Sequence, residues 1–432
     1  MELVLAPPAR RPAHPLLDAL PRPARETLAW FPAPDGRVVE RRRGACRLLD
    51  PLGGDALPCP APPPGTAPLA RFAGRRWAMG AGVAWIEGRL LAGAESRRVA
   101  RLVVEDPALA AALAADLPLL PAAVPLAEEA LALAESRPPR AAAGPPTLRP
   151  GAAAEATLAA ATRHLLAVLL AESARVSPDD PRGVHQSRVA LRRLRSLVKM
   201  FRPAGEGWSE WNQALGALAR SLGEARDWDV FTGGIAAGTL AALNGDARLR
   251  RLARAAEAER RAAYARLAAE LAGPGFRALV FEGLRLAALP PPGDGTPLAP
   301  LAARLLRRRW KRLKRAGAVI EDLPAEALHE MRLDAKRLRY AAEPFAALWP
   351  GKRGRRFLRR LAALQEALGL ANDAEVAKDL AARLAGRGAG GFAIGTVTGF
   401  AAGRAEGSRL AAIAAWRELA RTPRFWHGEP ES

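Results

Sequence analysis

The chain has 432 residues, half of them apolar, and its 65 Lys and Arg exceed its 44 Asp and Glu, which gives a formal net charge of +21. This length predicts two or three domains, each able to bury its own core, and the apolar content excludes a chain that is disordered throughout. No apolar run approaches the ~20 residues that cross a bilayer, and the N-terminus lacks a basic segment followed by an apolar core, so we expect neither a membrane span nor a secretory signal.

Proline is concentrated in the N-terminal third of the chain. Residues 1–145 contain 22 of the 38 prolines and have a net charge of only +3. Because proline breaks helix interiors and central strands, we expect short strands and loops here. Residues 75–93 indicate a strand, a turn and a strand, and residues 108–134 indicate helical pieces separated by prolines. Two cysteines, Cys46 and Cys59, exclude a disulfide scaffold and a four-cysteine zinc site, favour two unrelated thiols and suit a reducing cytoplasm.

Beyond residue 151 the sequence is rich in Ala, Leu, Arg and Glu, which predicts long helices, and it contains an internal repeat. Residues 184–201 match residues 328–345 at an offset of 144, and a second match at an offset of 146 aligns Leu222-Gly223 with Leu368-Gly369. Each copy should hold a helix, a basic helix and a helix that ends at the Leu-Gly turn, and short connections make such helices antiparallel neighbours. We therefore expect a mainly α chain with an N-terminal domain at 1–137, a Pro/Gly linker at 138–151, and helical bundles at 152–293 and 294–432.

The basic helix of each copy carries its cations at alternating spacings of three and four residues. The positions are His185, Arg188, Arg192, Arg195 and Lys199 in the first copy, and His329, Arg332, Lys336 and Arg339 in the second. At 3.6 residues per turn each set follows one helix face, about 100° from the apolar face. The basic stripe therefore borders the core, and we expect both stripes to line the wall of one groove between helices.

The placement of charge indicates a polyanionic partner. Residues 146–432 contain 47 basic and 29 acidic residues, a net charge of +18. A row of like charges on one helix face repels itself by a few tenths of a kcal/mol per pair, and a bridging anion removes this cost. Arg and Lys both bind phosphate oxygens. A solvated basic face is the alternative, but the same spacing occurs twice and a histidine opens each stripe. The basic run at 304–315 covers most faces of a helix, and its Arg304, Arg308, Lys311 and Arg315 form a stripe that could flank the groove.

Acidic residues follow the Leu-Gly pairs, with Asp227 and Asp229 in the first copy and Asp373 and Glu375 in the second. They could form a metal site, but carboxylates beside so many arginines favour salt bridges that orient the basic row. We expect no metal and no cofactor, since no P-loop, zinc or catalytic-triad spacing occurs. Nucleic acid is a weaker candidate partner because the basic rows contain a single aromatic residue, Tyr340, and bases need aromatic platforms.

Two sequence motifs resemble a known family. H-x-x-R-V-A-L-R-R-L-R from His185 and L-H-x-x-R-x-x-A-K-R-L-R-Y-x-x-E from Leu328 are similar to the two characteristic helices of the CHAD family, the conserved histidine α-helical domain. The glycine-rich residues 399–404 and the Phe425-Trp426 pair resemble it too, so the likeness spans about 152–428. It implies two four-helix bundles related by a pseudo-twofold axis, binding of inorganic polyphosphate through the basic stripes, and conserved histidines at His185 and His329. A cytoplasmic location, including polyphosphate granules, and no membrane partner follow as expectations.

Residues 1–137 resemble the CYTH domain, whose working members are triphosphate tunnel metalloenzymes with an E-x-E-x-K strand. In this chain Glu2 is the one carboxylate of the first strand, no Lys follows it, and the later strand at 99–105 has only Glu105. Metal-assisted triphosphate hydrolysis needs several carboxylates to hold the ions. The resemblance therefore implies a small β-rich α+β domain, which we expect to be non-catalytic. A metal-dependent triphosphatase or polyphosphatase acting through this domain is the alternative, as is nucleic-acid binding by the helical part.

Overall fold

The computed structural model describes residues 2–5, 18, 20–33, 37–49, 57–62, 64–80, 82–146, 148, 151–288, 295–387 and 389–427. The chain forms two compact units. The first unit comprises Met1–Gly144, Leu166–Ala174 and Glu270–Ala288, and the second comprises Pro145–Leu165, Arg175–Ala269 and Leu289–Ser432. The expected boundary at 293/294 lies outside the described residues, as do Met1 of the expected first strand and residues 147, 149 and 150 of the expected linker.

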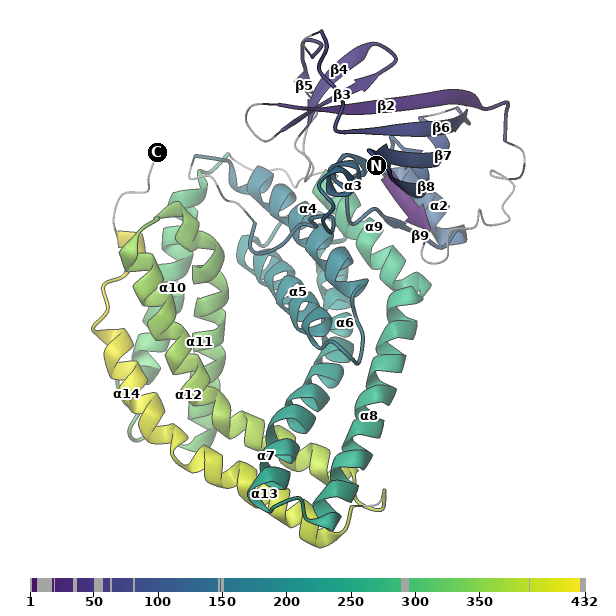
Figure 1. The fold of residues 1–432 in the computed structure, drawn as a ribbon. Coiled ribbons are helices and arrows are strands. Elements are labelled where there is room, and N and C mark those ends of the chain that lie inside the picture. The colour runs from purple at the N-terminus through teal and green to yellow at the C-terminus, as the bar shows by residue number, and fades with distance from the viewer. Residues whose placement is uncertain are drawn as a thin grey trace. The chain divides into compact units, whose positions relative to one another are not determined.

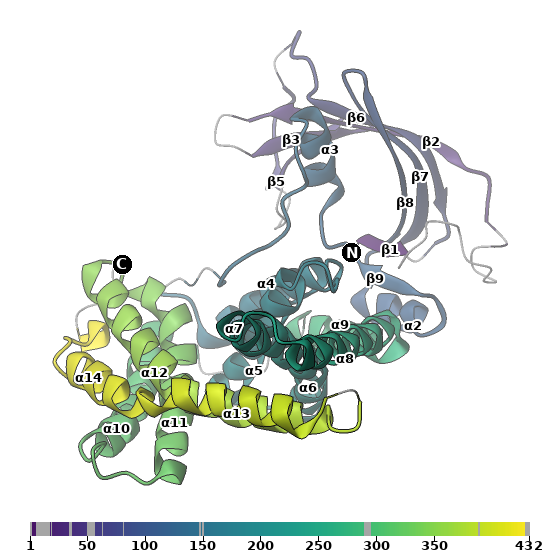
Figure 2. The same ribbon diagram turned by 60° about the horizontal axis from the view of Figure 1, so that its bottom comes forward.

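The first unit is built on an antiparallel sheet with the strand order β5-β4-β3-β2-β6-β7-β8-β1-β9, and Figure 2 shows that this sheet is strongly curved. The strands are β1 Glu2–Leu5, β2 Ala24–Pro32, β3 Val38–Arg42, β4 Ala45–Leu49, β5 Leu57–Pro58, β6 Ala70–Ala78, β7 Val83–Ala92, β8 Glu95–Val104 and β9 Leu119–Pro121. The strand, turn and strand predicted at 75–93 are confirmed by β6 and β7. Arg43 and Gly44, which join β3 to β4, both have positive φ, as a two-residue hairpin turn of type I′ requires.

Helices cover both faces of this sheet, because alternate residues of each strand point to opposite sides. Helix α3 (Leu126–Ala134) packs on one face, in a core cluster with Trp30, Phe72 and Leu90. Helices α2 (Pro107–Asp116) and α9 (Pro274–Ala288) cover the other face, in a cluster that includes Trp85 and Phe281. The predicted helical pieces at 108–134 are therefore confirmed as α2 and α3, with the short strand β9 between them.

The second unit is helical (Figure 1). Its helices are α4 Ala154–Ser173, α5 Arg182–Phe201, α6 Trp208–Val230, a π-helical turn Phe231–Ala236, α7 Ala237–Ala242, α8 Ala247–Ala272, α10 Leu298–Gly317, α11 Ala325–Phe345, α12 Lys352–Arg383, α13 Gly391–Glu406 and α14 Ser408–Ala420; the last residues of α4 and α8 belong to the first unit. The repeat predicted these bounds well, since α4 and α10 begin and end at equivalent residues and α5 and α11 both end at equivalent phenylalanines.

Residues that are equivalent in the two copies meet each other. The 154 amide donates to the 296 carbonyl and the 298 amide donates to the 152 carbonyl, each at 3.1 Å, around an antiparallel bridge between Ala153 and Pro297. At the repeat offset of 144, residue 296 is equivalent to 152 and residue 298 to 154, so the two hydrogen bonds are reciprocal and Ala153 pairs with its own equivalent. Phe201 and Phe345, also 144 apart, bring their ring centroids within 6.3 Å, and the two basic helices α5 and α11 pack together.

The expectation that each Leu-Gly pair ends a helix is wrong. Leu222-Gly223 lies inside α6, and Leu368-Gly369 lies inside α12. Glycine weakens a helix interior by roughly 1 kcal/mol relative to alanine, which makes it a plausible terminator on sequence alone. At Gly223 the structure gives a different reason, which is contact with a side chain of another helix.

Two further expectations concern the membrane and the cysteines. Helix α4 is long and apolar enough to cross a membrane, so the expectation that no apolar run approaches this length is wrong. However, 67% of its most apolar stretch of 18 residues is buried inside the protein, as in the core helix of a folded domain. Cys46 and Cys59 are both free thiols, although the Cys59 amide donates to the Cys46 carbonyl at 3.3 Å across neighbouring strands.

Candidate functional site

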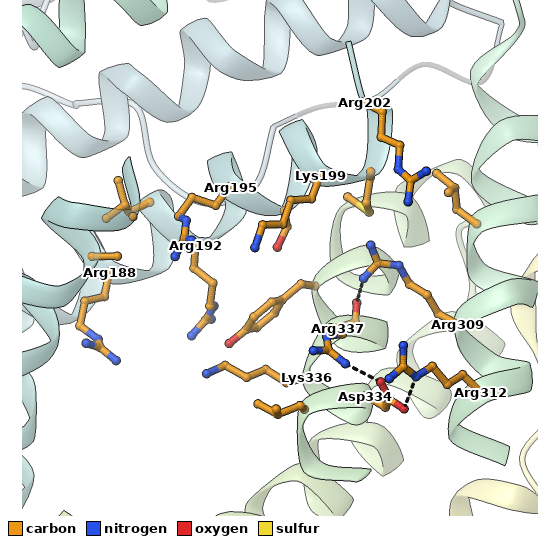
Figure 3. Close-up of a pocket in the computed structure, with 18 of the residues that line it drawn as sticks. Arg188, Arg192, Arg195, Lys199, Arg202, Arg309, Arg312, Asp334, Lys336 and Arg337 are labelled. Atoms are coloured by element: carbon orange, nitrogen blue, oxygen red, sulfur yellow. Dashed lines mark hydrogen bonds and ion pairs between the residues drawn. The ribbon is translucent and has the colours of Figure 1, made fainter. Parts of the chain in front are cut away.

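A cavity of about 720 Å³ lies in the second unit, among α5, α6, α10 and α11 (Figure 3). Among the residues that the structure describes, its lining contains eleven Lys or Arg side chains and one carboxylate, Asp334. The eleven cations are Arg188, Arg192, Arg195, Lys199, Arg202, Arg220, Arg308, Arg309, Arg312, Lys336 and Arg337. Since α5 and α6 belong to the first copy and α10 and α11 to the second, cations of both copies converge on one space.

The amphipathic pattern of α5 brings its cations to the cavity wall. Leu191, Leu194 and Val198 are buried, as the sequence predicts, and they fix the rotation of the helix against the core. Arg192 and Arg195, next to this apolar face, are then half-buried and turned into the space between helices (Figure 3). Long cationic side chains suit this border position because their apolar stems pack while their heads reach the cavity.

Asp334 holds two of the eleven cations. Its carboxylate accepts from Arg312 Nε and Arg337 Nη1, both at 2.8 Å, and Arg309 Nη1 donates to the Arg337 carbonyl at 2.6 Å (Figure 3). Asp334 is 7% exposed, so this bridge fixes α10 against α11 at the cavity edge. Within the part of the chain that the structure describes, the other nine cations of the lining form no ion pair.

The crowding of positive charge perturbs the ionisation of the lining. Burial, together with the charges of Arg332, Arg192 and Arg188, lowers the pKa of Lys336 from 10.5 to about 8. Burial and neighbouring arginines also lower the pKa of Lys199. Each shift means that holding the lysine in its charged form costs free energy in this lining, and an anion bound beside it would remove this cost.

Tyr340 adds a neutral donor to the lining. The Arg192 guanidinium lies over its ring, 4.3 Å from the centroid, in a cation–π contact. The Tyr340 side chain is 8% exposed, and its hydroxyl has no hydrogen-bond partner among the described residues. The Nε atoms of Arg192 and Arg195 are also buried without a partner there. Buried polar atoms are normally satisfied, so these donors carry a cost, and a side-chain movement that exposed them to an anion in the cavity would remove it.

Two glycines of α6 lie directly beneath two arginines of α5. A Cβ atom on Gly223 would stand 2.8 Å from Arg188 Nη1, and one on Gly216 would stand 3.2 Å from Arg195 Nη2. The glycines are seven residues apart, as are the arginines, so the two antiparallel helices match over two turns. The missing side chains leave the space in which these guanidinium groups lie. Gly369, the repeat equivalent of Gly223, has no atom within 4 Å of such a Cβ.

Six of the eleven predicted site residues line the cavity: Arg188, Arg192, Arg195, Lys199, Lys336 and Arg308. The other five lie outside it: His185, His329, Arg332, Arg339 and Arg304. Both histidines are exposed, and partial burial with the charges of neighbouring arginines lowers the pKa of His185. Arg339 instead donates to Glu343 at 2.6 Å and to Gln365 at 3.2 Å. Glu343 occupies the position that Lys199 has in the first copy, so the second stripe ends in a carboxylate that pairs with its last cation.

Sequence reasoning missed five cations of the lining: Arg202, Arg220, Arg309, Arg312 and Arg337. Part of the signal was present, because Arg309 and Arg337 each follow a predicted site residue in a basic doublet. Asp334 was missed as well. Of the Leu-Gly acids, Asp227 acts on the basic row as expected, because its charge opposes the lowering of the Arg188 pKa by burial, whereas Asp229 pairs elsewhere. Asp229 accepts from Arg260 at 3.1 Å and from the Tyr264 hydroxyl at 3.0 Å, so it holds α6 to α8 and orients no cation of the cavity. Across the described residues no group of three or more His, Cys, Asp or Glu could hold a metal ion.

Comparison with known proteins shows to which family this chain belongs. The family model described as "CHAD domain" matches residues 159–382, more than half of the chain. The chain is similar to the crystal structure of the CHAD domain from the plant Ricinus communis, with 29% identity and a TM-score of 0.50, over 65% of this chain and 97% of that one. It shares its fold with PptA from Streptomyces chartreusis, with 17% identity and a TM-score of 0.50, over 62% of this chain and 99% of that one. A comparison with curated proteins gives no match. The match begins in α4 and ends in α12, so it contains all four helices of the cavity, and the chain belongs to the CHAD domain family.

Proposed function

We propose that this protein binds inorganic polyphosphate without hydrolysing it, and that the polymer occupies the cavity among α5, α6, α10 and α11. The observation that carries the proposal is the charge of the lining, eleven cations against one carboxylate, with nine cations lacking an ion pair among the described residues. A linear polymer with a negative charge on every unit is the ligand class that neutralises such a lining most fully. Guanidinium groups bind phosphate oxygens through paired hydrogen bonds, and Tyr340 adds a further donor.

The residue types of the lining favour a phosphate polymer over nucleic acid. Binding of single strands relies on aromatic side chains that offer a free face to successive bases. Tyr340 is the one aromatic residue of the lining, and the Arg192 guanidinium already covers its ring. A site with many cations and no free aromatic face suits a polymer that has charge and no bases.

We also propose that the two helical copies form antiparallel four-helix bundles related by a pseudo-twofold axis. A twofold axis requires residue i of one half to meet residue j of the other, and j to meet i. The reciprocal hydrogen bonds between 154 and 296 and between 298 and 152 support this relation, as does the contact of Phe201 with Phe345. For residues 1–137 we propose a CYTH-like domain without catalytic activity, and for the whole protein a cytoplasmic location.

Titration calorimetry on the full chain tests the proposed function. Tripolyphosphate and long-chain polyphosphate would be compared with single-stranded and duplex DNA at matched phosphate and salt concentrations. We expect long-chain polyphosphate to bind far more tightly than either DNA, with an affinity that falls steeply with salt because counterions are released. DNA binding as tight as polyphosphate would overturn the assignment.

A triple variant locates the site. Arg188→Ala/Arg192→Ala/Arg195→Ala should weaken both tripolyphosphate and long-chain polyphosphate, by about 100-fold or more if each cation contributes about 1 kcal/mol. The matched control, Arg250→Ala/Arg251→Ala/Arg254→Ala, removes the same charge from exposed positions of α8 that have no ion pair among the described residues. Equal losses in the two variants would show that net charge, and not the cavity, determines binding. Thermal melting checks that each variant folds.

A further inference from the structure

The cations of α10 extend beyond the cavity. Eight Lys and Arg lie between residues 304 and 315, and the cavity uses Arg308, Arg309 and Arg312. Five remain outside it: Arg304, Arg307, Lys311, Lys314 and Arg315. All five are exposed, and none forms an ion pair in the part of the chain that the structure describes. A solvated helix needs no such accumulation of unpaired like charge, so these residues need an explanation of their own.

A second hollow, of about 420 Å³, lies on another side of α10. Trp310 and Lys314 of α10, with Ala318 just after its end, form one wall, and Trp416 of α14 and the segment 420–424 form the other. The segment contributes Arg421 and Arg424, and no carboxylate of the described part of the chain belongs to the lining. Neither arginine forms an ion pair among the described residues, and both are exposed. The hollow therefore presents three cations to solvent.

The walls of this hollow are rigid. The rings of Trp310 and Trp416 pack with centroids 5.8 Å apart. Trp416 lies so close to Gly317 that a Cβ atom there would stand 2.1 Å from its ring, so the side chain is locked against α10. The Trp310 indole N–H is buried without a partner, in a side chain that is 6% exposed. The packed tryptophans therefore hold in place the walls that carry Lys314, Arg421 and Arg424.

The two hollows are linked by rows of residues three apart on α10. A step of three residues turns by about −60° around the helix and rises about 4.5 Å. Arg308 lines the cavity, Lys311 is exposed one step further, and Lys314 lines the second hollow at the next step. The parallel row runs from Arg312 in the cavity through exposed Arg315 to Ala318 in the second hollow. Cations therefore follow the surface of α10 from one hollow to the other, over about 9 Å along the axis.

We propose that Lys314, Arg421 and Arg424 form a second anion-binding site, which takes phosphate groups of the same linear polyphosphate whose other phosphates occupy the cavity. The proposal rests on the proposed function and extends it. Lys311 and Arg315 neutralise the phosphates that cross the exposed face of α10 between the two sites. A short chain fills the cavity alone, whereas a long chain reaches both sites, and the second contact then forms at high effective concentration.

The test is the variant Lys314→Ala/Arg421→Ala/Arg424→Ala, titrated with tripolyphosphate and with long-chain polyphosphate. We expect less than about twofold loss for tripolyphosphate and about tenfold or greater loss for the long chain. The slope of log affinity against log salt for the long chain should become smaller by roughly two to three, since three phosphate contacts are removed. The variant with Arg250, Arg251 and Arg254 changed to Ala has the same net charge and should keep the long-chain affinity within about twofold.

The possible failures are distinguishable. Wild-type protein that binds neither polyphosphate would overturn the proposed function. Wild-type protein that binds, with a Lys314/Arg421/Arg424 variant indistinguishable from the α8 control, would overturn the second site alone. Equal losses for tripolyphosphate and the long chain would place Lys314 and its neighbours in the primary site and would also contradict the proposal. Because all three residues are exposed, the variant should melt as the wild type does; Lys314→Met/Arg421→Gln/Arg424→Gln keeps the side-chain stems and should give the same binding results.

Discussion

Replacing Gly223 with alanine separates binding from stability. The new Cβ would stand 2.8 Å from Arg188 Nη1, closer than the 3.0 Å below which a neighbour must shift, so the guanidinium must move away by a few tenths of an ångström. The obstacle is the end of a flexible side chain, so the backbone of α6 need not change. A hydrogen bond from a charged group contributes about 1.5–3 kcal/mol when well aligned. Losing about half of one such contact corresponds to roughly a three- to tenfold loss of polyphosphate affinity.

The same change should make the fold more stable. Gly223 is in the interior of α6, where alanine is favoured over glycine by about 0.5–1 kcal/mol. We expect a melting temperature raised by roughly 1–4 °C together with weaker binding, measured by calorimetry on one preparation. A mutation that merely damaged the fold would lower both quantities, so opposite signs identify Gly223 as a positioning residue for Arg188.

The repeat supplies the matched control. Gly369 occupies the equivalent position in α12, and a Cβ there would meet no atom within 4 Å. Gly369→Ala should therefore raise the melting temperature and leave affinity unchanged. Gly216→Ala should show a smaller loss than Gly223→Ala, because its Cβ would stand 3.2 Å from Arg195 Nη2. Unchanged affinity in Gly223→Ala, or an equal loss in Gly369→Ala, would refute the reasoning.

Three other predictions follow from the geometry of the site. The pKa of Lys336 is lowered to about 8 in the empty cavity, and a bound anion raises it again, so binding takes up a proton. Polyphosphate affinity should be flat from about pH 5.5 to about pH 7, because both predicted histidines lie outside the cavity. It should fall as pH rises through about 8, where Lys336 loses its proton. Lys336→Met should abolish this fall and, by removing a disfavoured charge, raise the melting temperature at neutral pH. Arg195→Ala should cost affinity, whereas Arg339→Ala should cost mainly stability, since Arg339 is held by Glu343. Triphosphate should not be hydrolysed with Mg²⁺ or Mn²⁺, and phosphate release that disappears in Glu2→Gln or Glu105→Gln would show that the N-terminal domain is an active enzyme.

Periodicity predicted most of the helical architecture. The match of residues 184–201 with residues 328–345 anticipated the ends of α5 and α11, because helix ends depend on local proline and glycine positions and on the length of each apolar face. The basic stripe of α5 also came from local spacing, since a rigid helix converts sequence intervals into directions. Four of its five members line the cavity.

The remaining lining depends on contacts that no local pattern contains. Arg312 and Arg337 enter the cavity because they share Asp334, and the two helices meet there only after packing. Gly223 looked like a helix terminator, but it makes room for the guanidinium of Arg188, which lies on another helix and 35 residues earlier in the sequence. Arg339 leaves the stripe because Gln365 of α12 accepts from it together with Glu343. Arg312, Arg188 and Gln365 each act from another helix, although Arg337 and Arg339 also pair with acids of their own helix.

The two copies reach the cavity in different ways, and burial explains the difference. At the repeat offset, Arg309 and Arg312 of α10 correspond to Leu165 and Val168 of α4, which are 0% and 5% exposed. A helix buried on those faces cannot carry cations there, because each would lose its hydration without gaining an anion. The first copy therefore supplies cations from α5, whereas the second supplies them largely from α10, while Glu343 neutralises the later part of its own stripe. Two equivalent sets of helices thus carry an asymmetric set of charges. A linear polyphosphate has the same chemistry in both directions, so such a site can bind it in either orientation without a symmetric lining.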